Sequence, residues 1–186
     1  MNYLSITPCD IANGQGVRTV LWVSGCSLHC PGCHNPESHN RCAGKPFDED
    51  AKKELFDALS KPYIQGLTLS GGHPLEDYNL KDIAKLINEI KIQFPDKDIW
   101  LYTGRILSWV DLERMHNFCE TGMKPIEHKW HNLRYAILHK CDVIVDGPFI
   151  QEQRDITLQF RGSTNQRIID VAKTIEQKEI VLWEKH

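Results

Sequence analysis

The sequence lacks the features of a membrane or secreted protein. No apolar run approaches membrane-spanning length, and the N-terminus has no basic stretch followed by an apolar core. These absences favour a cytosolic location, where thiols stay reduced. The chain has seven cysteines, an odd number, so a disulfide framework is not expected either.

The sequence also lacks a strong net charge. Its 22 basic and 25 acidic residues are spread along the chain and leave a formal charge of -3. Such a chain offers no extended cationic surface for a phosphate backbone, so nucleic acid is not the expected partner. With 186 residues and 41% hydrophobic content, the chain can bury one sizeable core and is too short for a second. We therefore expect a single domain over residues 1–186.

Strand and helix patterns alternate along the chain. Four apolar segments predict strands, and they span residues 17–24, 66–70, 99–103 and 143–146. Apolar residues at helical spacing predict one helix after the capping residue Asp48 and a second that ends at Pro95, and Ser108 is expected to cap a third. This alternation indicates an α/β fold with a parallel sheet, right-handed crossovers and flanking helices.

Residues suited to a binding site follow the predicted strands. A loop rich in cysteine follows the first strand, and the later strands end at Gly71-Gly72, Thr103-Gly104 and Asp146-Gly147. The carboxyl ends of parallel strands meet at one edge of a sheet, where ligands and catalytic groups collect. One site is therefore expected to contain all four segments.

The cysteine loop holds three thiols within eight residues, Cys26, Cys30 and Cys33. Three thiolates can hold three irons of a 4Fe-4S cluster and leave the fourth iron open for a substrate. Pro31 and Gly32 disfavour a helix, so a loop wrapped around a compact guest is expected.

Two other interpretations of these cysteines remain open. A zinc site with His29 or His34 as the fourth ligand is chemically reasonable, and cysteine is also a common buried residue. Structural zinc sites usually take their ligands in two pairs from separate segments, which favours the cluster here. The remaining cysteines are interpreted as small buried hydrophobes, and they are Cys9, Cys42, Cys119 and Cys141.

The CxxxCxxC motif after an apolar strand resembles the signature of radical S-adenosylmethionine (SAM) enzymes. The flanking motifs resemble one family in particular, the activating proteins of anaerobic ribonucleoside-triphosphate reductases, and the resemblance runs from Met1 to about Ile168. The segments that carry it are Met1-Asn2-Tyr3, Pro8-Cys9-Asp10, Asn13-Gly14-Gln15-Gly16, Val23-Ser24-Gly25-Cys26, Lys97-Asp98-Ile99-Trp100, Thr103-Gly104, Val145-Asp146-Gly147 and Arg161-Gly162-Ser163-Thr164-Asn165-Gln166.

The resemblance implies a fold, a chemistry and a partner. The fold is an incomplete (β/α) barrel, open on one side. The chemistry is reductive cleavage of SAM at a 4Fe-4S cluster held by the three cysteines of the loop, with one iron left open. The product is a glycyl radical on the large reductase subunit, which is the implied protein partner, together with a reducing electron donor. Activation of another glycyl radical enzyme, such as pyruvate formate-lyase, and a non-enzymatic zinc-binding module are the alternatives.

The resemblance also implies residues that contact SAM. They are Gly32, Cys33 and His34 in the cysteine loop, Gly72 after the second predicted strand and Thr103 after the third. The remaining chain offers two less specific candidates. Asp146 either orients a ribose, binds a cation or caps the next turn, and the segment 161–166 either completes the site or meets the partner.

The chain departs from the family pattern at three positions near these motifs. His34 and Arg105 stand where an aromatic residue is usual, and His73 stands where an acidic residue is usual. A neutral imidazole accepts a hydrogen bond from the SAM ammonium but does not attract it as a carboxylate does. Backbone groups are therefore expected to do most of the binding, and His73→Asp is expected to tighten it.

Residues 115–140 resemble an insertion into the shorter family pattern. The segment has weak periodicity, and its side chains include Cys119 and four histidines, His116, His128, His131 and His139. A solvated helical excursion is the favoured interpretation. A small metal site formed with Cys141 is the alternative.

Overall fold

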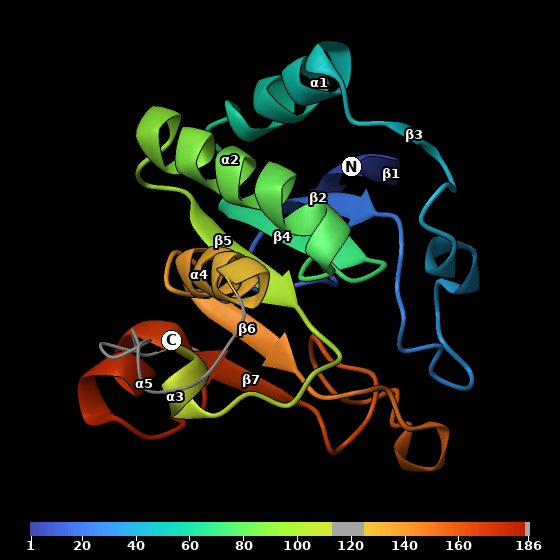
Figure 1. Ribbon diagram of the computed structural model, residues 1–186, viewed down its shortest axis with the longest axis vertical. Helices are drawn as coiled ribbons and strands as arrows, with labels where there is room; N and C mark the ends of the chain where they lie inside the picture. The colour runs from blue at the N-terminus through green and yellow to red at the C-terminus, as the bar shows by residue number, and fades with distance from the viewer. Residues whose placement is uncertain (113–124, 185–186) are drawn as a thin grey trace.

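One seven-stranded sheet organises the chain, and the computed structural model describes residues 1–112 and 125–184 (Figure 1). From one edge to the other the strands are β3 (Lys45–Pro46), β1 (Asn2–Asp10), β2 (Arg18–Val23), β4 (Gly66–Gly71), β5 (Asp98–Tyr102), β6 (Val143–Asp146) and β7 (Arg167–Asp170). The four central strands, β2, β4, β5 and β6, are parallel neighbours. They are the four strands that the sequence predicts, so this part of the prediction is confirmed.

The expectation of a purely parallel sheet is wrong at both edges. β1 pairs antiparallel with β2, β3 pairs antiparallel with β1, and β7 pairs antiparallel with β6. Residues 11–17 connect β1 to β2 and are too few for a crossover helix, so the chain can only return antiparallel. Residues 147–166 lead into β7 with one short helix, η3 (Gln151–Gln153), and do not cross the sheet.

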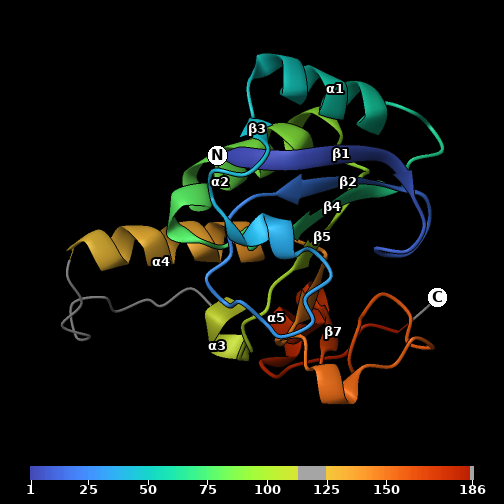
Figure 2. The ribbon, with the colours of Figure 1, turned by 90° about the vertical axis from the view of Figure 1, so that its right-hand side faces the viewer.

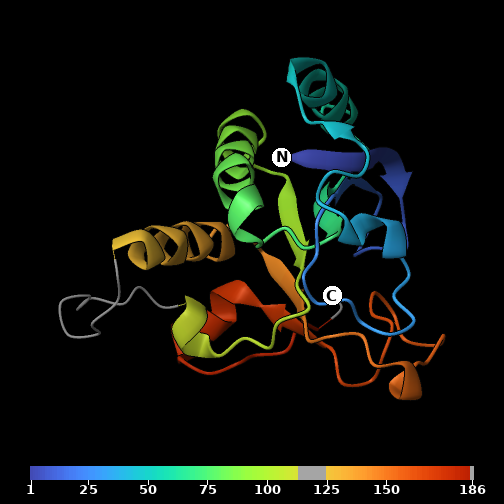
Figure 3. The same cartoon turned by 45° about the vertical axis from the view of Figure 1, so that its right-hand side comes forward.

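The α-helices cover one face of the sheet (Figures 1 and 3). α1 (Glu49–Leu59) is capped by the Asp48 carboxylate, which accepts a hydrogen bond of 3.0 Å from Ala51 N–H, as the sequence predicts. The sequence also predicts the long helix that ends before Pro95, and this is α2 (Asp77–Gln93). Further helices are η1 (Pro36–His39), α3 (Trp109–Leu112), α4 (Pro125–Leu138) and α5 (Val171–Gln177).

Alternation along the central strands separates two apolar clusters. Leu21, Leu69 and Leu101 belong to the larger cluster, which also contains the buried residues of α1 and α2. Trp100 and Val145 belong to a smaller cluster that includes side chains from the C-terminal third of the chain. Successive residues of a strand point to opposite faces, so helices cover one face and loops cover the other.

The expectation of a solvated helical excursion within residues 115–140 is only half right. α4 is helical, but Ile137 and Leu138 are buried in the main core, and the helix packs beside α2 (Figure 2). α4 therefore covers the sheet as α1 and α2 do. His116 and Cys119 lie outside the described residues, and so do the side chains of His128 and His131.

Within the described residues, no helix combines the length and apolar character that crossing a bilayer requires.

Candidate active site

The cysteine loop, residues 24–35, leaves β2 and is held by the short helix η1 that follows it. Gly25 N–H donates to Ser38 C=O at 2.7 Å, and Cys26 N–H donates to His39 C=O at 3.2 Å. Gly25 and Gly32 have φ angles of +91° and +72°, which a side chain would strain. The loop contains no helix, as the positions of proline and glycine predict.

The three loop cysteines are free thiols, and each is half-buried. Burial raises the pKa of the Cys26 thiol, while backbone N–H groups of Leu28 and His29 act in the opposite direction. The described residues contain no group of three Cys, His, Asp or Glu side chains close enough to hold a single metal ion. In a 4Fe-4S cluster each thiolate binds a different iron, so its ligands lie farther apart than those of one ion. Three free thiols spread along one loop therefore suit a cluster.

The glycine turn after β4 is packed directly against the start of the cysteine loop. Gly72 N–H donates to Val23 C=O at 2.7 Å, and His73 N–H donates to Gly25 C=O at 2.8 Å. A Cβ atom on Gly72 would lie 2.6 Å from the Gly25 carbonyl oxygen, closer than real contacts allow. The buried Asn79 amide reinforces this contact, because it donates to Ser24 C=O at 3.1 Å and to His73 C=O at 3.2 Å. The two motifs that the sequence singles out therefore form one rigid unit.

Glu76 is a site residue that the sequence analysis missed. Its carboxylate accepts hydrogen bonds from Ser27 Oγ at 2.6 Å, from Ser27 N–H at 3.1 Å and from His73 Nδ1 at 3.2 Å. The hydrogen bond from His73 is the main reason why the pKa of Glu76 falls to about 2. The available signal was an acidic residue three positions after His73, at the start of a helix.

His73 and Thr103 are partners of each other. His73 Nε2 lies 2.8 Å from Thr103 Oγ1, and both side chains are buried. Both ring nitrogens of His73 are therefore engaged within the protein. The effect of His73→Asp on SAM binding stays a prediction, and an Asp at this position would face the carboxylate of Glu76.

A cavity of about 510 Å³ opens beside the third cysteine at the carboxyl ends of the strands. Trp22, Ser70 and Tyr102 line it from β2, β4 and β5, and Cys33 and His34 line it from the cysteine loop. Trp22 and Ser70 are register partners on neighbouring strands, so the side chains share one face of the sheet.

Residues of the segment that follows β6 line the other side of this cavity. Figures 2 and 3 show this segment beside the cysteine loop. The rings of Phe149 and His34 lie 5.8 Å apart. A Cβ atom on Gly32 would lie 2.1 Å from Gln151 Oε1, so the cysteine loop and this segment are in direct contact. Gly32 thus provides close packing at the cavity edge.

Arg161, Gly162 and Gln166 also line the cavity, so residues 161–166 complete the pocket wall. Gln166 Oε1 accepts from Gly162 N–H at 2.9 Å and from Ser163 N–H at 3.1 Å, and Arg161 Nη1 donates to Gln166 C=O at 2.6 Å. Of the two roles open for this motif, the structure supports a part in building the cavity.

Asp146 lies behind the cavity and is fully buried. It accepts a hydrogen bond of 3.0 Å from Arg167 Nε and one of 2.8 Å from Leu107 N–H. This ion pair raises the pKa of Arg167. Asp146 thus anchors the chain after β5, a role that the sequence analysis did not include among ribose binding, cation binding and capping of the next turn.

The predicted SAM contacts thus occupy two layers. Cys33 and His34 line the cavity, and Gly32 packs at its edge. Gly72 and Thr103 lie behind this layer, where they hold the cysteine loop and His73.

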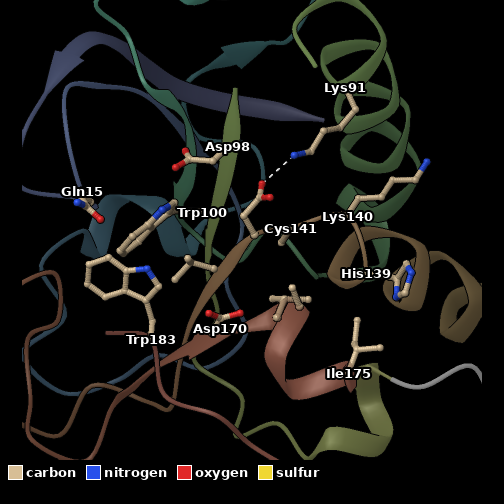
Figure 4. A pocket seen from close by; sticks show the side chains of 14 residues that line it. Gln15, Lys91, Asp98, Trp100, His139, Lys140, Cys141, Asp170, Ile175 and Trp183 are labelled. Carbon is tan, nitrogen blue, oxygen red and sulfur yellow. Dashed lines mark hydrogen bonds and ion pairs between the residues drawn. The ribbon is translucent and has the colours of Figure 1, made fainter. Parts of the chain in front are cut away.

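A second cavity, of about 640 Å³, lies at the amino ends of β5 and β6 (Figure 4). Its charged side chains are engaged in the fold. Lys91 pairs with Asp142 at 2.8 Å, Asp98 pairs with Arg18 at 2.6 Å, and Asp170 caps α5. None of the cysteine-loop residues lines this cavity.

Comparison with known proteins agrees with this site. A family model described as a 4Fe-4S single cluster domain matches residues 12–169. An anaerobic ribonucleoside-triphosphate reductase-activating protein from Pasteurella multocida is 40% identical over 170 residues, which cover 90% of this chain and 96% of the relative. Proteins of the same name from Enterobacteria phage T4 and Escherichia coli K12 are 39% and 36% identical over 168 residues, which cover 90% and 89% of this chain and 93% and 96% of the relatives. The chain therefore belongs to the family of anaerobic ribonucleoside-triphosphate reductase-activating proteins.

Proposed function

We propose that this chain is a radical SAM enzyme that activates an anaerobic ribonucleoside-triphosphate reductase. Its cluster ligands are Cys26, Cys30 and Cys33, and the open iron binds SAM. The single observation that carries the proposal is one loop that holds three free, half-buried thiols and whose third cysteine, Cys33, lines a cavity together with His34.

The chemistry comes from the cluster and SAM, and the protein holds and orients them. When bound, the two groups would supply one-electron reductive cleavage of SAM to methionine and a 5′-deoxyadenosyl radical, which would take a hydrogen atom from a backbone glycine of the reductase and leave 5′-deoxyadenosine and a glycyl radical. The electron comes from a reducing donor protein or small reductant. The rings of His34 and Phe149 offer surfaces for the adenine, and the half-buried side chains of Trp22 and Tyr102 limit water at the cavity wall.

The sheet supports the proposal of an incomplete radical SAM barrel. Side chains near the carboxyl ends of three parallel strands, β2, β4 and β5, line one cavity, and α-helices cover the outer face of the sheet. The inner face is covered by the segment 147–166. Loops form the wall of this site, and the chain has few helices or strands beyond the sheet and its covering helices. Such a site suits a protein loop as substrate, because a small substrate would need a lid.

Anaerobic assays with two cysteine variants test the proposal. Reduced protein, SAM and the reductase are expected to yield 5′-deoxyadenosine and a glycyl doublet by electron paramagnetic resonance. Cys30→Ala is expected to abolish both signals and to lower bound iron. Cys42→Ala is the matched control and is expected to match the wild type. Cys42 is a free thiol outside the loop motif, and it is exposed, as Cys9 is, so the expectation that these two cysteines are buried is wrong.

Three outcomes would contradict the proposal. Retained activity in Cys30→Ala would exclude this residue as a ligand. A colourless protein with stoichiometric zinc would support the non-enzymatic module. A doublet on pyruvate formate-lyase but not on the reductase would assign the chain to a different glycyl radical enzyme.

A further inference from the structure

A chain of hydrogen-bonded polar groups, buried except for Ser27, links three loops at the carboxyl ends of the sheet. It runs from Ser27 in the cysteine loop through Glu76 and His73 to Thr103 after β5. The residues Glu76, His73 and Thr103 are only 8%, 1% and 3% exposed. The chain continues to the backbone, because Arg105 N–H donates to Thr103 Oγ1 at 3.2 Å.

Every member of this chain is satisfied when Glu76 is ionised and His73 is neutral. The carboxylate is an acceptor, so His73 Nδ1 carries the proton. His73 Nε2 then accepts from the Thr103 hydroxyl, whose oxygen accepts from the backbone N–H of Arg105. A buried carboxylate with three donors is a fixed negative charge, because hydrogen bonds to the charged form favour it.

Ser27 is the point at which this charge holds the cysteine loop. Its N–H and its hydroxyl both donate to one oxygen of Glu76, at 3.1 and 2.6 Å, and it directly follows Cys26 in the sequence.

We infer that Glu76 is a positioning residue of the cluster site: through Ser27 it fixes the first cysteine of the loop against the glycine turn, and its charge lowers the reduction potential of the bound cluster. The inference rests on the proposed function for its cluster. The charge acts on the potential because adding an electron beside a fixed anion is unfavourable in a poorly solvated site.

Two variants separate the geometric role from the electrostatic one. Glu76→Gln keeps an acceptor oxygen for Ser27 and removes the charge. Glu76→Ala removes both. The matched control is Glu37→Gln, because Glu37 lies exposed on η1 in the same part of the chain and makes no hydrogen bond through its side chain to any described residue.

The first measurement is hydrogen exchange in the anaerobically reconstituted, full-length protein. In Glu76→Ala the peptide that contains Ser27 is expected to exchange on the order of tenfold faster, because the amide loses a charged acceptor. The same variant is expected to release iron to a chelator several-fold faster. Glu76→Gln is expected to stay close to the wild type in both hydrogen exchange and iron release, and Glu37→Gln is expected to equal the wild type in both.

The second measurement is a redox titration of the cluster, followed by electron paramagnetic resonance. Glu76→Gln is expected to raise the midpoint potential, and Glu37→Gln, with the same loss of charge at an exposed site, is expected to leave it unchanged. An unchanged potential in Glu76→Gln overturns the electrostatic part. If Glu76→Ala shows wild-type hydrogen exchange and wild-type iron retention, the positioning role of Glu76 is overturned. If Glu76→Ala does not fold, the midpoint potential of Glu76→Gln still tests the electrostatic role.

These outcomes are separate from failure of the proposed function. A wild-type protein that holds iron but yields no 5′-deoxyadenosine would contradict the proposed function. Hydrogen exchange of the peptide that contains Ser27 would still show whether Glu76 positions Ser27. A fully active wild type with variants identical to it would sink the inference alone.

Discussion

At the scale of single residues, the most unusual side chain is the fully buried Arg18 at the amino end of β2. Its guanidinium donates to Thr68 Oγ1 and to Leu67 C=O, each at 2.8 Å, pairs with Asp98 at 2.6 Å and lies 5.3 Å from the centre of the Trp100 ring. A buried cation is tolerated when its donors are satisfied in this way. Arg18 therefore closes the end of the inner sheet face opposite the cysteine loop.

We predict that Arg18→Ala lowers the free energy of unfolding by about 3 to 5 kcal/mol, because it leaves Asp98 without its partner. Burial already raises the pKa of Asp98, and loss of Arg18 raises it further. The loss of unfolding free energy in Arg18→Ala is therefore largest above the pKa of Asp98. It becomes smaller as the pH falls and Asp98 becomes protonated.

Chemical denaturation of the metal-free chain at several pH values measures this effect. Lys85→Ala is the control, since Lys85 is 68% exposed and its ion pair with Glu89 contributes at most about 1 kcal/mol. A pH-independent loss in Arg18→Ala would show that packing, rather than the ion pair, accounts for the change.

At the scale of elements, the glycine turn after β4 has a structural role in packing against the cysteine loop. Gly71 has a φ of +95°, and Gly72 packs against the backbone of Gly25. The turn thus sets the distance between two loops before any ligand is bound. Its position in the fold by itself accounts for the glycine pair.

Gly72→Ala is predicted to destabilise the protein by about 1 to 3 kcal/mol, because the added methyl group forces two backbone segments apart. Gly104→Ala is the comparison. Its Cβ would meet only the tip of the flexible Leu28 side chain, which can move, so a smaller loss is expected. Thermal unfolding and iron content of the two variants check the prediction, and equal losses would mean that the contact with Gly25 is not restrictive.

The elements that sequence patterns predict are the long or strongly apolar ones. α1 and α2 follow from their caps, apolar spacing and prolines, and the four parallel strands follow from apolar runs. β1 and β7 were not predicted. β1 contains Pro8 and polar residues, and β7 has only four residues, so pairing with a neighbour rather than local preference makes them strands.

At the scale of the whole molecule, the cavities at the two ends of the sheet have different linings. The cavity at the carboxyl ends gathers the cysteine loop and residues 161–166. The larger cavity at the amino ends gathers charged side chains that are paired with each other or with the backbone (Figure 4). Cavity volume alone would therefore select the amino ends of the strands and not the end that carries the cysteine loop.

A pair of histidine variants tests this division. His34→Ala removes a ring from the carboxyl-end cavity, and His139→Ala removes one from the amino-end cavity, and both side chains are exposed. His34→Ala is predicted to weaken SAM binding about tenfold, which corresponds to one lost stacking contact. His139→Ala is predicted to leave it unchanged. Equilibrium binding of SAM to the reconstituted protein measures both, and weaker binding in His139→Ala alone would move the site to the other end.

By itself the sequence determined the ligand chemistry and the central strands, because both are written in short stretches: three cysteines within one loop, and apolar runs that end in glycine. Only the tertiary structure decided that Glu76 holds Ser27, that His73 faces Thr103, and that residues 161–166 close the cavity. Those contacts join positions 30 to more than 100 residues apart. No local pattern records such a distance, because the contact exists only once the sheet has brought its strand ends together.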